Sequence, residues 1–357
     1  MNQTMSKNFD SVLTKEKGYD YLNQILRENV YSKVFVLTDT NVSQFCLPVF
    51  LRKLSTELDI EVVEVDHGEA FKTIETCIEL WKLLLEYGAD RKSMVINLGG
   101  GVITDLGGFV ASSYKRGIEF VHVPTTLLAM VDAAIGGKNG VDFEGLKNQI
   151  GTIQLPNKVI IDSEFLTSLS KQQMRSGLAE MFKHGLIYDS VYWNQLKGLS
   201  NLTGEDLDEL IYRSVEIKQE ITNQDPLEKG LRKALNFGHT IGHAIESFLL
   251  DNPEKFTLLH GEAVALGMVA ESYISFQMNL IDQAAYQEIK DTLLGLYLPQ
   301  TFTLEQIHQM IDLMSHDKKN EFGQINFTLL ESIGKCVVNQ VVNNDLIVKS
   351  FDEINCP

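Results

Sequence analysis

The stretch MVINLGGGVITDLGGFVASSY, residues 94–114, decides how the first half of this chain is expected to fold. Its first five residues are nearly all apolar, as in a strand that is buried within a parallel sheet. Gly99, Gly100 and Gly101 follow directly, and apolar residues then recur at helical spacing. Glycines at such a turn let backbone N–H groups approach a phosphate, whose charge the start of the helix favours. Taken alone, the segment is equally typical of a tight strand-to-helix turn.

The same alternation extends on both sides of this stretch. Short runs rich in β-branched and apolar residues predict further strands: 34–37, 61–65 and 119–123. Helical spacing predicts the helices between them: 42–58, 74–87 and 102–114. The first half is therefore expected to be a Rossmann-like α/β domain, a parallel sheet covered by helices that binds ligands at the carboxyl ends of its strands.

After residue 162 the strand-like runs give way to spacings of three and four. The expected helices are 165–197, 207–222, 232–250 and 261–279. A late pair of short strands is expected at 324–330 and 334–341. We therefore expect two domains, an α/β domain at 1–164 and a mainly α-helical domain at 165–357.

Composition excludes several classes of protein. Of 357 residues, 44% are hydrophobic and 22% charged, which is typical of a globular chain and not of a disordered one. The formal charge of −17 argues against a nonspecific nucleic-acid binder, because phosphate would be repelled. No secretory signal or membrane span is recognisable, so a cytoplasmic location is expected. The 4 cysteines are scattered, which favours reduced thiols.

Polar residues follow two of the predicted strands. Asp39 and Asn41 come after the first strand, and Glu69 and Lys72 after the second. Such residues can bind the hydroxyl groups of a ribose that lies across the end of the sheet. Each one alone is as well explained as a helix cap or a turn residue. Together they favour a dinucleotide as the ligand.

A second polar region lies downstream. The segment PTTLLAMVD, residues 124–132, starts with residues suited to a helix start and places Asp132 on an otherwise apolar stretch. Lys138 follows a pair of glycines, and Lys147 and Asn148 come a short loop later. Lysines in this setting are reasonable phosphate ligands. A surface loop with solvated lysines is the alternative.

Histidines and a carboxylate gather in the helical half. His239 and His243 are four residues apart, so on a helix both imidazoles face the same way, as a divalent metal requires. His260 follows after a loop, and Glu180 lies on an earlier predicted helix. A single histidine would more often be structural, and spacing alone leaves the ligand set open. Three other histidines are predicted to be structural: His67, His122 and His308.

Basic residues surround the same region in the sequence. Lys183 lies one helical turn after Glu180, and Lys218 belongs to the next predicted helix. Arg232 precedes Asn236 by four residues, on the face that carries His239. In so acidic a chain, cations grouped around a metal motif indicate a small anionic substrate. For Lys218 alone, a solvated helix face remains the default interpretation.

Seven segments, in order along most of the chain, together resemble the 3-dehydroquinate synthases among the sugar-phosphate cyclases. They are GGGVITDLGGFVASSYKRG (99–117), VPTTLLAMVDAAIGGKNGVD (123–142), GLKNQIGTIQLP (145–156), GLAEMFKHGLI (177–187), LRKALNFGHTIGHAIE (231–246), HGEAVALGM (260–268) and DKKNEFGQINFTLLESIG (317–334). The resemblance implies conversion of 3-deoxy-D-arabino-heptulosonate 7-phosphate to 3-dehydroquinate and phosphate. In that reaction NAD is reduced and then reoxidised, so it is not consumed.

The resemblance also implies the ligands of the cofactors. A divalent metal, zinc or cobalt, would be bound by Glu180, His239 and His260, so that His243 faces the substrate and is not a ligand. This differs from the pair His239 and His243 that the spacing indicates. The implied NAD ligands are Asp39, Asn41, Glu69, Lys72, Gly100, Gly101, Asp105, Thr125 and Thr126.

Substrate contacts are implied in the same way. The implied catalytic residues are Asp132, Lys138, Lys183 and His243. The implied substrate-binding residues are Arg116, Lys147, Asn148, Lys218, Arg232, Asn236 and Lys319, the last of which is preferred to Lys318. The protein would be a homodimer in which Arg116 of one protomer enters the site of its partner.

One departure and two alternatives remain. Thr104 stands before Asp105 where the family commonly has glycine, which makes the backbone of the cofactor loop less free. A metal-dependent alcohol or glycerol dehydrogenase would share both halves but would consume NAD stoichiometrically. A nucleotide-binding or metal-sensing regulator would keep the fold without catalysis. The intact set of Glu180, Lys183 and the three histidines favours an enzyme.

Overall fold

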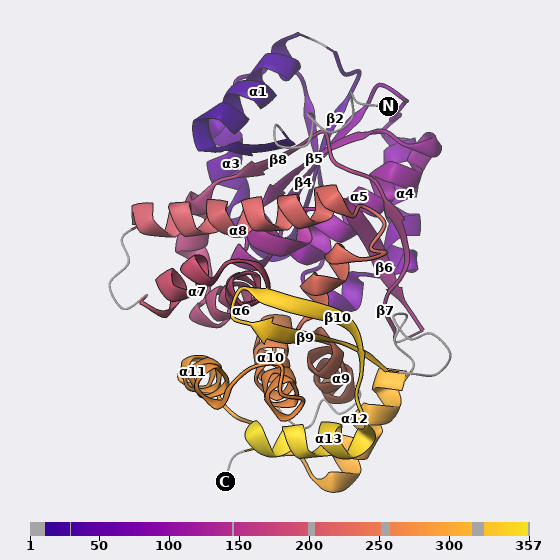
Figure 1. Ribbon diagram of the computed structural model, residues 1–357. Coiled ribbons are helices and arrows are strands. Elements are labelled where there is room, and N and C mark those ends of the chain that lie inside the picture. Colours follow the sequence, from indigo (N-terminus) through magenta and orange to yellow (C-terminus); the bar gives the residue numbers. More distant parts are fainter. Residues whose placement is uncertain are drawn as a thin grey trace. The chain divides into compact units, whose positions relative to one another are not determined.

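The computed structural model describes residues 11–28, 30–144, 146–198, 204–250, 258–315 and 325–355. Two units are distinguished, Met1–Ser170 and Lys171–Pro357 (Figure 1). The first is built on a six-stranded parallel sheet, and the second is mainly helical. The predicted fold class, a Rossmann-like α/β half followed by a helical half, is confirmed.

The sheet of the first unit has the strand order β1–β8–β5–β4–β2–β3, and each of its pairings is parallel. The four strands that the sequence predicts are present: β2 (Val34–Asp39), β3 (Ile60–Val65), β4 (Met94–Gly99) and β5 (Glu119–Pro124). Two strands that it does not predict, β1 (Val12–Thr14) and β8 (Lys158–Ile161), complete the sheet. In parallel strands the carboxyl ends lie at one edge, so the residues after β2, β4 and β5 are neighbours.

Helices connect these strands. The long ones are α1 (Lys15–Arg27), α4 (Ile74–Glu86) and α5 (Gly101–Ser113), and the latter two confirm the prediction. The short ones are η2 (Glu69–Phe71), η3 (Tyr114–Arg116), η4 (Ala129–Ala133) and η5 (Ser163–Ser168). Thr104 lies within α5, where its hydroxyl group donates to the carbonyl of Gly101 at 3.1 Å. At this position threonine therefore adopts ordinary helical backbone.

The predicted single helix at 42–58 is wrong. The structure has two helices there, α2 (Thr40–Phe45) and α3 (Leu47–Lys53), and residues 54–58 are not helical. Pro48 lies in the first turn of α3. Proline has no N–H group to donate to the preceding turn, so helical hydrogen bonding cannot continue through it, whereas a helix can begin there.

The core of the first unit lies between the sheet and helices α4 and α5. Strand residues that alternate along the chain, such as Phe35 and Leu37, face these helices, which contribute Leu80 and Leu84 from α4 and Leu106 from α5. All are at most 4% exposed. This packing holds the start of α5 against the end of β4, where the glycine turn lies.

A buried polar pair lies on this sheet. Nδ2 of Asn97 in β4 is 3.2 Å from Nδ1 of His122 in β5, and both side chains are at most 2% exposed. Gly107 of α5 makes room for the pair, because a Cβ atom there would lie 1.9 Å from Oδ1 of Asn97. Burial, only partly opposed by a hydrogen bond with Asn139, lowers the pKa of His122 to about 3.

We expect His122 to make this protein less stable in mild acid. Between pH 6.5 and 3 the unfolded chain binds a proton at this residue that the folded chain does not, so stability is present above pH 6.5 and falls as the pH decreases. One proton corresponds to about 1.4 kcal/mol per pH unit. From pH 7.5 to 5, urea unfolding of the wild type should lose about 2 kcal/mol more than that of His122→Asn. Equal losses would contradict the assignment.

An antiparallel hairpin packs against α5 in the first unit. Its strands are β6 (Lys138–Phe143) and β7 (Leu146–Ile153). Asn139 stabilises its base, because its amide donates to the carbonyls of Gly137 and Gln154 at 3.0 and 2.9 Å. A bridge from Thr73 to Asp142 joins the hairpin to the start of α4. The hairpin therefore carries three predicted site residues: Lys138, Lys147 and Asn148.

The second unit consists of helices and one hairpin. The helices are α6 (Lys171–Tyr188), α7 (Ser190–Lys197), α8 (Gly204–Gln224), η7 (Leu231–Asn236), α9 (His239–Leu250), α10 (His260–Gln277), α11 (Gln283–Leu294), α12 (Leu304–Ser315), α13 (Asn344–Ser350) and η8 (Phe351–Glu353). The hairpin of β9 (Asn326–Ser332) and β10 (Lys335–Val341) confirms the predicted late strands. Within the described segments, no helix is both long and apolar enough to cross a membrane.

Two predicted helices of this unit are wrong in extent. The stretch 165–197 contains η5, α6 and α7. Asp189 is the N-cap of α7, and its carboxylate accepts two backbone N–H groups of the first turn. The stretch 232–250 is divided into η7 and α9 at Gly238, which has a φ of +78°. A positive φ interrupts a helix, and glycine adopts it without strain.

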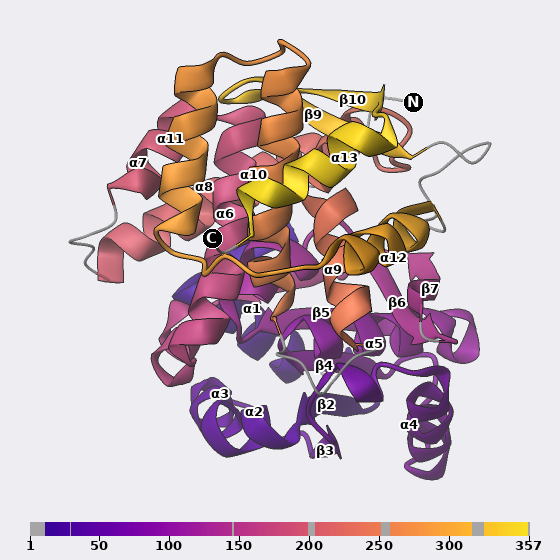
Figure 2. The same cartoon turned by 90° about the horizontal axis from the view of Figure 1, so that it is seen from below.

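Helix α10 lies at the centre of the second unit. It packs against α6, α9 and α11 (Figure 2). Fourteen of its 18 residues are buried, so it has no polar face of the kind that surface helices show. The buried polar groups on α10 therefore need hydrogen-bond partners within the protein. This central helix begins with His260 and adjoins the two helices that carry Glu180 and His239.

Candidate active site

The glycine turn after β4 is closely packed. A Cβ atom at Gly99 would lie 2.6 Å from Cβ of Ile103, and one at Gly100 would lie 3.0 Å from Cγ2 of Thr126. Gly100 occupies the N-cap position of α5, and no described side chain caps this helix. The first N–H groups of α5 therefore remain suitable for a phosphate. Gly101 is the first residue of this helix.

The residues after β5 adjoin this turn. The backbone N–H group of Thr125 donates to the carbonyl of Gly99 at 2.9 Å, and the hydroxyl oxygen of Thr126 accepts from Ala129 at 3.2 Å. The predicted NAD ligands of β4 and β5 are thus brought together at one edge of the sheet. This is the place at which parallel sheets bind dinucleotides.

Asp39 is a helix cap, which is one of the two roles that the sequence allows for it. It ends β2, and its Oδ1 accepts the N–H groups of Asn41 and Val42 at 2.9 and 3.0 Å, so it is the N-cap of α2. Asn41 is exposed in the first turn of that helix. The second carboxylate oxygen of a capping aspartate can still accept a ribose hydroxyl group, so this capping role is compatible with a cofactor contact.

Predicted cofactor and substrate residues are joined by ion pairs and hydrogen bonds. Nζ of Lys72 lies 2.6 Å from both Oδ2 of Asp105 and Oδ1 of Asn148. Nζ of Lys147 lies 3.3 Å from Oε1 of Glu69. Burial alone would lower the pKa of Lys72, but Asp105 and then Glu69 raise it above its ordinary value. Lys72 therefore stays charged and connects the hairpin with α5.

The remaining predicted residues of the first unit differ in exposure. Lys138 is exposed at the first position of β6, and Asp132 lies half-buried in η4. Arg116 is exposed, with a φ of +71°. Its neighbours Lys115 and Gly117 also have positive φ, so the turn presents Arg116 outward.

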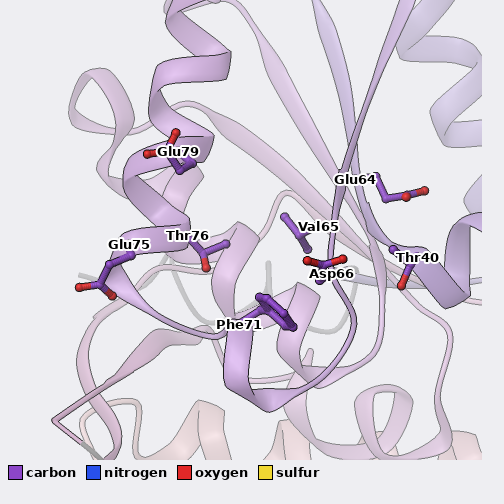
Figure 3. A pocket seen from close by; sticks show the side chains of 8 residues that line it. All are labelled: Thr40, Glu64, Val65, Asp66, Phe71, Glu75, Thr76 and Glu79. Atoms are coloured by element: carbon purple, nitrogen blue, oxygen red, sulfur yellow. The ribbon is translucent and has the colours of Figure 1, made fainter.

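A pocket of about 410 Å³ lies beyond the end of β3 (Figure 3). Its lining comes from the end of β3, from Phe71 of η2, from Thr40 of α2 and from the first turns of α4. Four of the lining residues are carboxylates: Glu64, Asp66, Glu75 and Glu79. None of the predicted site residues lines it. So many carboxylates would repel a phosphate, so this pocket is not a phosphate site.

The second unit brings the predicted metal ligands together. Glu180 of α6 is completely buried, and its Oε1 lies 3.4 Å from Nε2 of His239 and 3.6 Å from Nε2 of His260. Oε1 of Glu180 has no hydrogen-bond partner among the described residues, whereas Oε2 forms an ion pair with Lys183. In a tetrahedral site with bonds of about 2.1 Å, neighbouring ligand atoms lie about 3.4 Å apart. Both distances from Oε1 of Glu180 are compatible with a divalent cation held by these residues.

The other ring nitrogens of these histidines are engaged. Nδ1 of His239 lies 3.1 Å from the carbonyl oxygen of Phe237, and Nδ1 of His260 lies 3.2 Å from Oε2 of Glu246. A proton on Nδ1 leaves Nε2 as the metal-binding atom, which is the usual arrangement in metal sites. The sequence assigns no role to Glu246, although it lies seven residues after His239, on the same helix face.

His243 provides an alternative third metal ligand in place of Glu180. Its ring centroid lies 5.0 Å from that of His239 and 5.6 Å from that of His260. One nitrogen from each of the three rings falls within 4.8 Å of the others, which is also compatible with a metal. Both sets contain His239 and His260, so they differ only in Glu180 against His243.

Charge is concentrated at Glu180. Burial alone would raise the pKa of Glu180, but the ammonium group of Lys183, with which it forms an ion pair, lowers it well below its ordinary value, helped by His239 and His260. Lys183 is 1% exposed. The carboxylate is therefore ionised at neutral pH, as a metal ligand must be.

Other predicted substrate residues lie on neighbouring elements of this unit. Lys218 on α8 and Arg232 on η7 are 6% and 3% exposed, which is unusual for cations on solvated helix faces. Nη1 of Arg232 donates to the carbonyl of Pro226, and Nδ2 of Asn236 donates to Glu228, at 2.9 and 3.1 Å. The late candidates lie outside the described residues: Lys318 and Lys319.

Comparison with known proteins decides the family. The family model of the 3-dehydroquinate synthase N-terminal part matches residues 62–176, and that of the C-terminal part matches residues 177–320. This chain belongs to the 3-dehydroquinate synthase family. The 3-dehydroquinate synthase of Parabacteroides distasonis is 42% identical over 343 residues, which are 93% of this chain and 94% of that protein. That of Campylobacter jejuni subsp. doylei is 37% identical, over 96% of this chain and 98% of its own.

Solved structures agree with membership of the 3-dehydroquinate synthase family. The 2-epi-5-epi-valiolone synthase ValA from Streptomyces hygroscopicus, solved with NAD⁺ and Zn²⁺ bound, is 28% identical with a TM-score of 0.83 and 96% of each chain covered. A glycerol dehydrogenase from Schizosaccharomyces pombe is 14% identical with a TM-score of 0.66, over 96% of this chain and 88% of its own. At that identity the likeness concerns the fold alone, so it does not favour the dehydrogenase alternative.

Proposed function

We propose that this protein is a 3-dehydroquinate synthase. It converts 3-deoxy-D-arabino-heptulosonate 7-phosphate to 3-dehydroquinate and phosphate, with NAD and a divalent metal, zinc or cobalt, as cofactors. The observation that carries this proposal is the intact cluster of Glu180, Lys183, His239 and His260 in a chain of this family, with Glu180 and Lys183 fully buried. It provides a metal site and a buried cation in the same place.

The cofactors have matching residues in the chain. The closely packed glycine turn and the uncapped start of α5 suit the pyrophosphate of NAD. Glu180, His239 and His260 would hold the metal. When bound, NAD supplies a reversible hydride acceptor, and the metal polarises the oxygen atoms of the substrate. Further NAD contacts are assigned to Asp39, Asn41, Glu69, Lys72, Asp105, Thr125 and Thr126.

Buried cations are assigned to the anionic groups of the substrate. Lys183, Lys218 and Arg232 are each at most 6% exposed. Cationic side chains suit the phosphate and the carboxylate that the substrate carries. Binding both groups holds the sugar ring in one orientation, which lowers the entropic cost of the transition state. The other assigned contacts are Lys138, Lys147, Asn148, Asn236 and Lys319.

His243 is assigned to proton transfer. Its ring lies beside the metal site, and the ordinary pKa of histidine is close to neutral pH. During oxidation of the ring alcohol, His243 accepts the hydroxyl proton while the hydride leaves the carbon atom. The ketone acidifies the neighbouring C–H bond, so loss of that proton forms a C=C bond as the C–O bond to phosphate breaks. The ketone is then reduced again, the ring opens, and an internal aldol step closes the carbocycle. Asp132 is assigned as a further catalytic residue that contacts the substrate.

A homodimer is part of this proposal. Arg116 is exposed on a turn with three consecutive positive φ angles, so its side chain is available to the site of a partner. The assignment to the partner's site depends on the family resemblance and not on a contact within one chain.

Phosphate release tests the proposed function. The protein is incubated with the heptulosonate phosphate, catalytic NAD and zinc or cobalt, and phosphate and NADH are measured together. We expect many phosphates released per NAD, no net NADH, and loss of release with a chelator. Stoichiometric NADH accumulation would instead identify a dehydrogenase. NAD binding by calorimetry without phosphate release under any metal condition would identify a regulator.

A further inference from the structure

Glu271 is a completely buried carboxylate in the third turn of α10. It accepts three backbone N–H groups at the start of α9. Oε2 accepts from Gly238 at 2.6 Å, and Oε1 accepts from Thr240 and Ile241, both at 3.1 Å. These hydrogen bonds and the positive end of the α9 dipole therefore stabilise its negative charge.

This arrangement replaces an ordinary N-cap. The residue before α9 is Gly238, which has no side chain to cap the helix and has a φ of +78°. A Cβ atom there would lie 2.4 Å from Cγ of Met268, so a serine or aspartate cap does not fit. The acceptor for the first N–H groups of α9 comes instead from another helix, 33 residues further along the chain.

The contact fixes the position of a predicted metal ligand. His239 is the first residue of α9, and Glu271 binds the N–H groups of the residues on both sides of it. His260 is the first residue of α10, the helix that carries Glu271. Glu271 therefore sets the position of α9 along α10, and with it the separation of the two imidazoles, whose ring centroids lie 5.4 Å apart.

Close backbone packing supports this interpretation. A Cβ atom at Gly267 of α10 would lie 2.0 Å from the carbonyl oxygen of Gly238 and 2.7 Å from the backbone nitrogen of Gly242. The two helices thus meet backbone to backbone directly beside the three hydrogen bonds. This packing leaves no free space to absorb a small shift of α9. A shift caused by loss of the carboxylate would therefore move His239 as well.

We propose that Glu271 is a positioning residue of the metal centre, holding His239 so that its Nε2 faces Glu180 and His260. This inference rests on the proposed function, because it assumes that these residues bind a metal. Glu271 itself touches neither metal nor substrate. It acts through the backbone on either side of His239.

The test measures metal binding directly. Wild type, Glu271→Gln, Glu271→Asp and Ser272→Ala are titrated with Zn²⁺ against a chromophoric chelator, and their Co²⁺ complexes are compared by visible absorption. Glutamine directs an amide donor toward N–H groups, so we expect about 10–100-fold weaker Zn²⁺ binding and an altered Co²⁺ spectrum. Aspartate keeps the charge but is shorter, and we expect a smaller loss. Ser272 is the matched control, buried next to Glu271 without a hydrogen bond from its hydroxyl group among the described residues.

The outcomes separate the two proposals. Wild-type Zn²⁺ affinity and Co²⁺ spectrum in Glu271→Gln would overturn the positioning role. If that variant does not fold by circular dichroism, the aspartate variant decides in the same way. Equal losses in Ser272→Ala would also overturn the role, because they would reflect general packing. A wild type that binds metal but releases no phosphate would refute the synthase and leave the positioning role standing. A wild type without metal affinity would refute both.

Discussion

Replacing Glu180 by glutamine is expected to abolish phosphate release and to lower the free energy of unfolding of the metal-free protein by about 3–5 kcal/mol. Both effects follow from burial. Glu180 and Lys183 form an ion pair at 0% and 1% exposure. The amide keeps the size of the side chain but removes its charge, so Lys183 is left as a buried cation without its partner charge. Under the proposed assignment, the metal also loses a ligand. Phosphate release and urea unfolding with a chelator measure the two effects.

A double variant separates stability from activity. Glu180→Gln combined with Lys183→Met removes both charges, so it should recover much of the unfolding free energy that the single variant loses. It should remain inactive, because the metal ligand and the substrate cation are both absent. If Glu180→Gln alone unfolds at the same urea concentration as the wild type, the buried ion pair does not stabilise the protein as expected. One that releases phosphate at the wild-type rate would contradict the role of Glu180 as a ligand.

Replacing His260 and His243 separately by alanine is expected to give two different losses. His260→Ala should bind zinc at least 100-fold more weakly and lose activity, because it removes a ligand. His243→Ala should keep wild-type zinc affinity but turn over about 10²–10⁴-fold more slowly, because it removes the group that accepts the hydroxyl proton. Zinc titration and phosphate release on the same samples measure both.

This pair of variants decides between the two ligand sets. If His243→Ala loses zinc affinity as strongly as His260→Ala, the three histidines are the ligands, as the spacing of His239 and His243 indicates. His308→Ala is the matched control, since His308 is an exposed histidine on α12. A loss of zinc affinity in that variant would mean that alanine substitution acts through something other than ligand removal.

The sequence predicts the long elements of the fold and misses those that only their neighbours stabilise. Strand β4 is recognisable because a continuous apolar run is typical of a strand buried on both faces. Strands β1 and β8 have three and four residues, too few for a pattern, and exist because they pair with one another and with β5. The break between α2 and α3 is predictable from Pro48, although the helical spacing continues across it.

At the candidate site, the sequence predicts the residues that belong to recognisable motifs. Glu180, His239 and His260 belong to segments that resemble a family, so their shared purpose is predicted before any geometry is known. The sequence does not predict the contacts that Glu246 and Glu271 make. Glu246 reaches His260 across 14 residues, and Glu271 reaches Gly238 across 33. Neither spacing has a local period, so no helix or strand pattern indicates it.

The sequence by itself determined the family, the two halves and the residue types that bind a metal and a dinucleotide, because periodicity and motifs are properties of neighbouring residues. Only the tertiary structure decided which nitrogen of each histidine faces Glu180, which cations are buried and which carboxylate holds the start of α9. Those features depend on how helices distant in sequence pack, and the same side chain is a ligand, a cap or a solvated group according to what the fold places beside it.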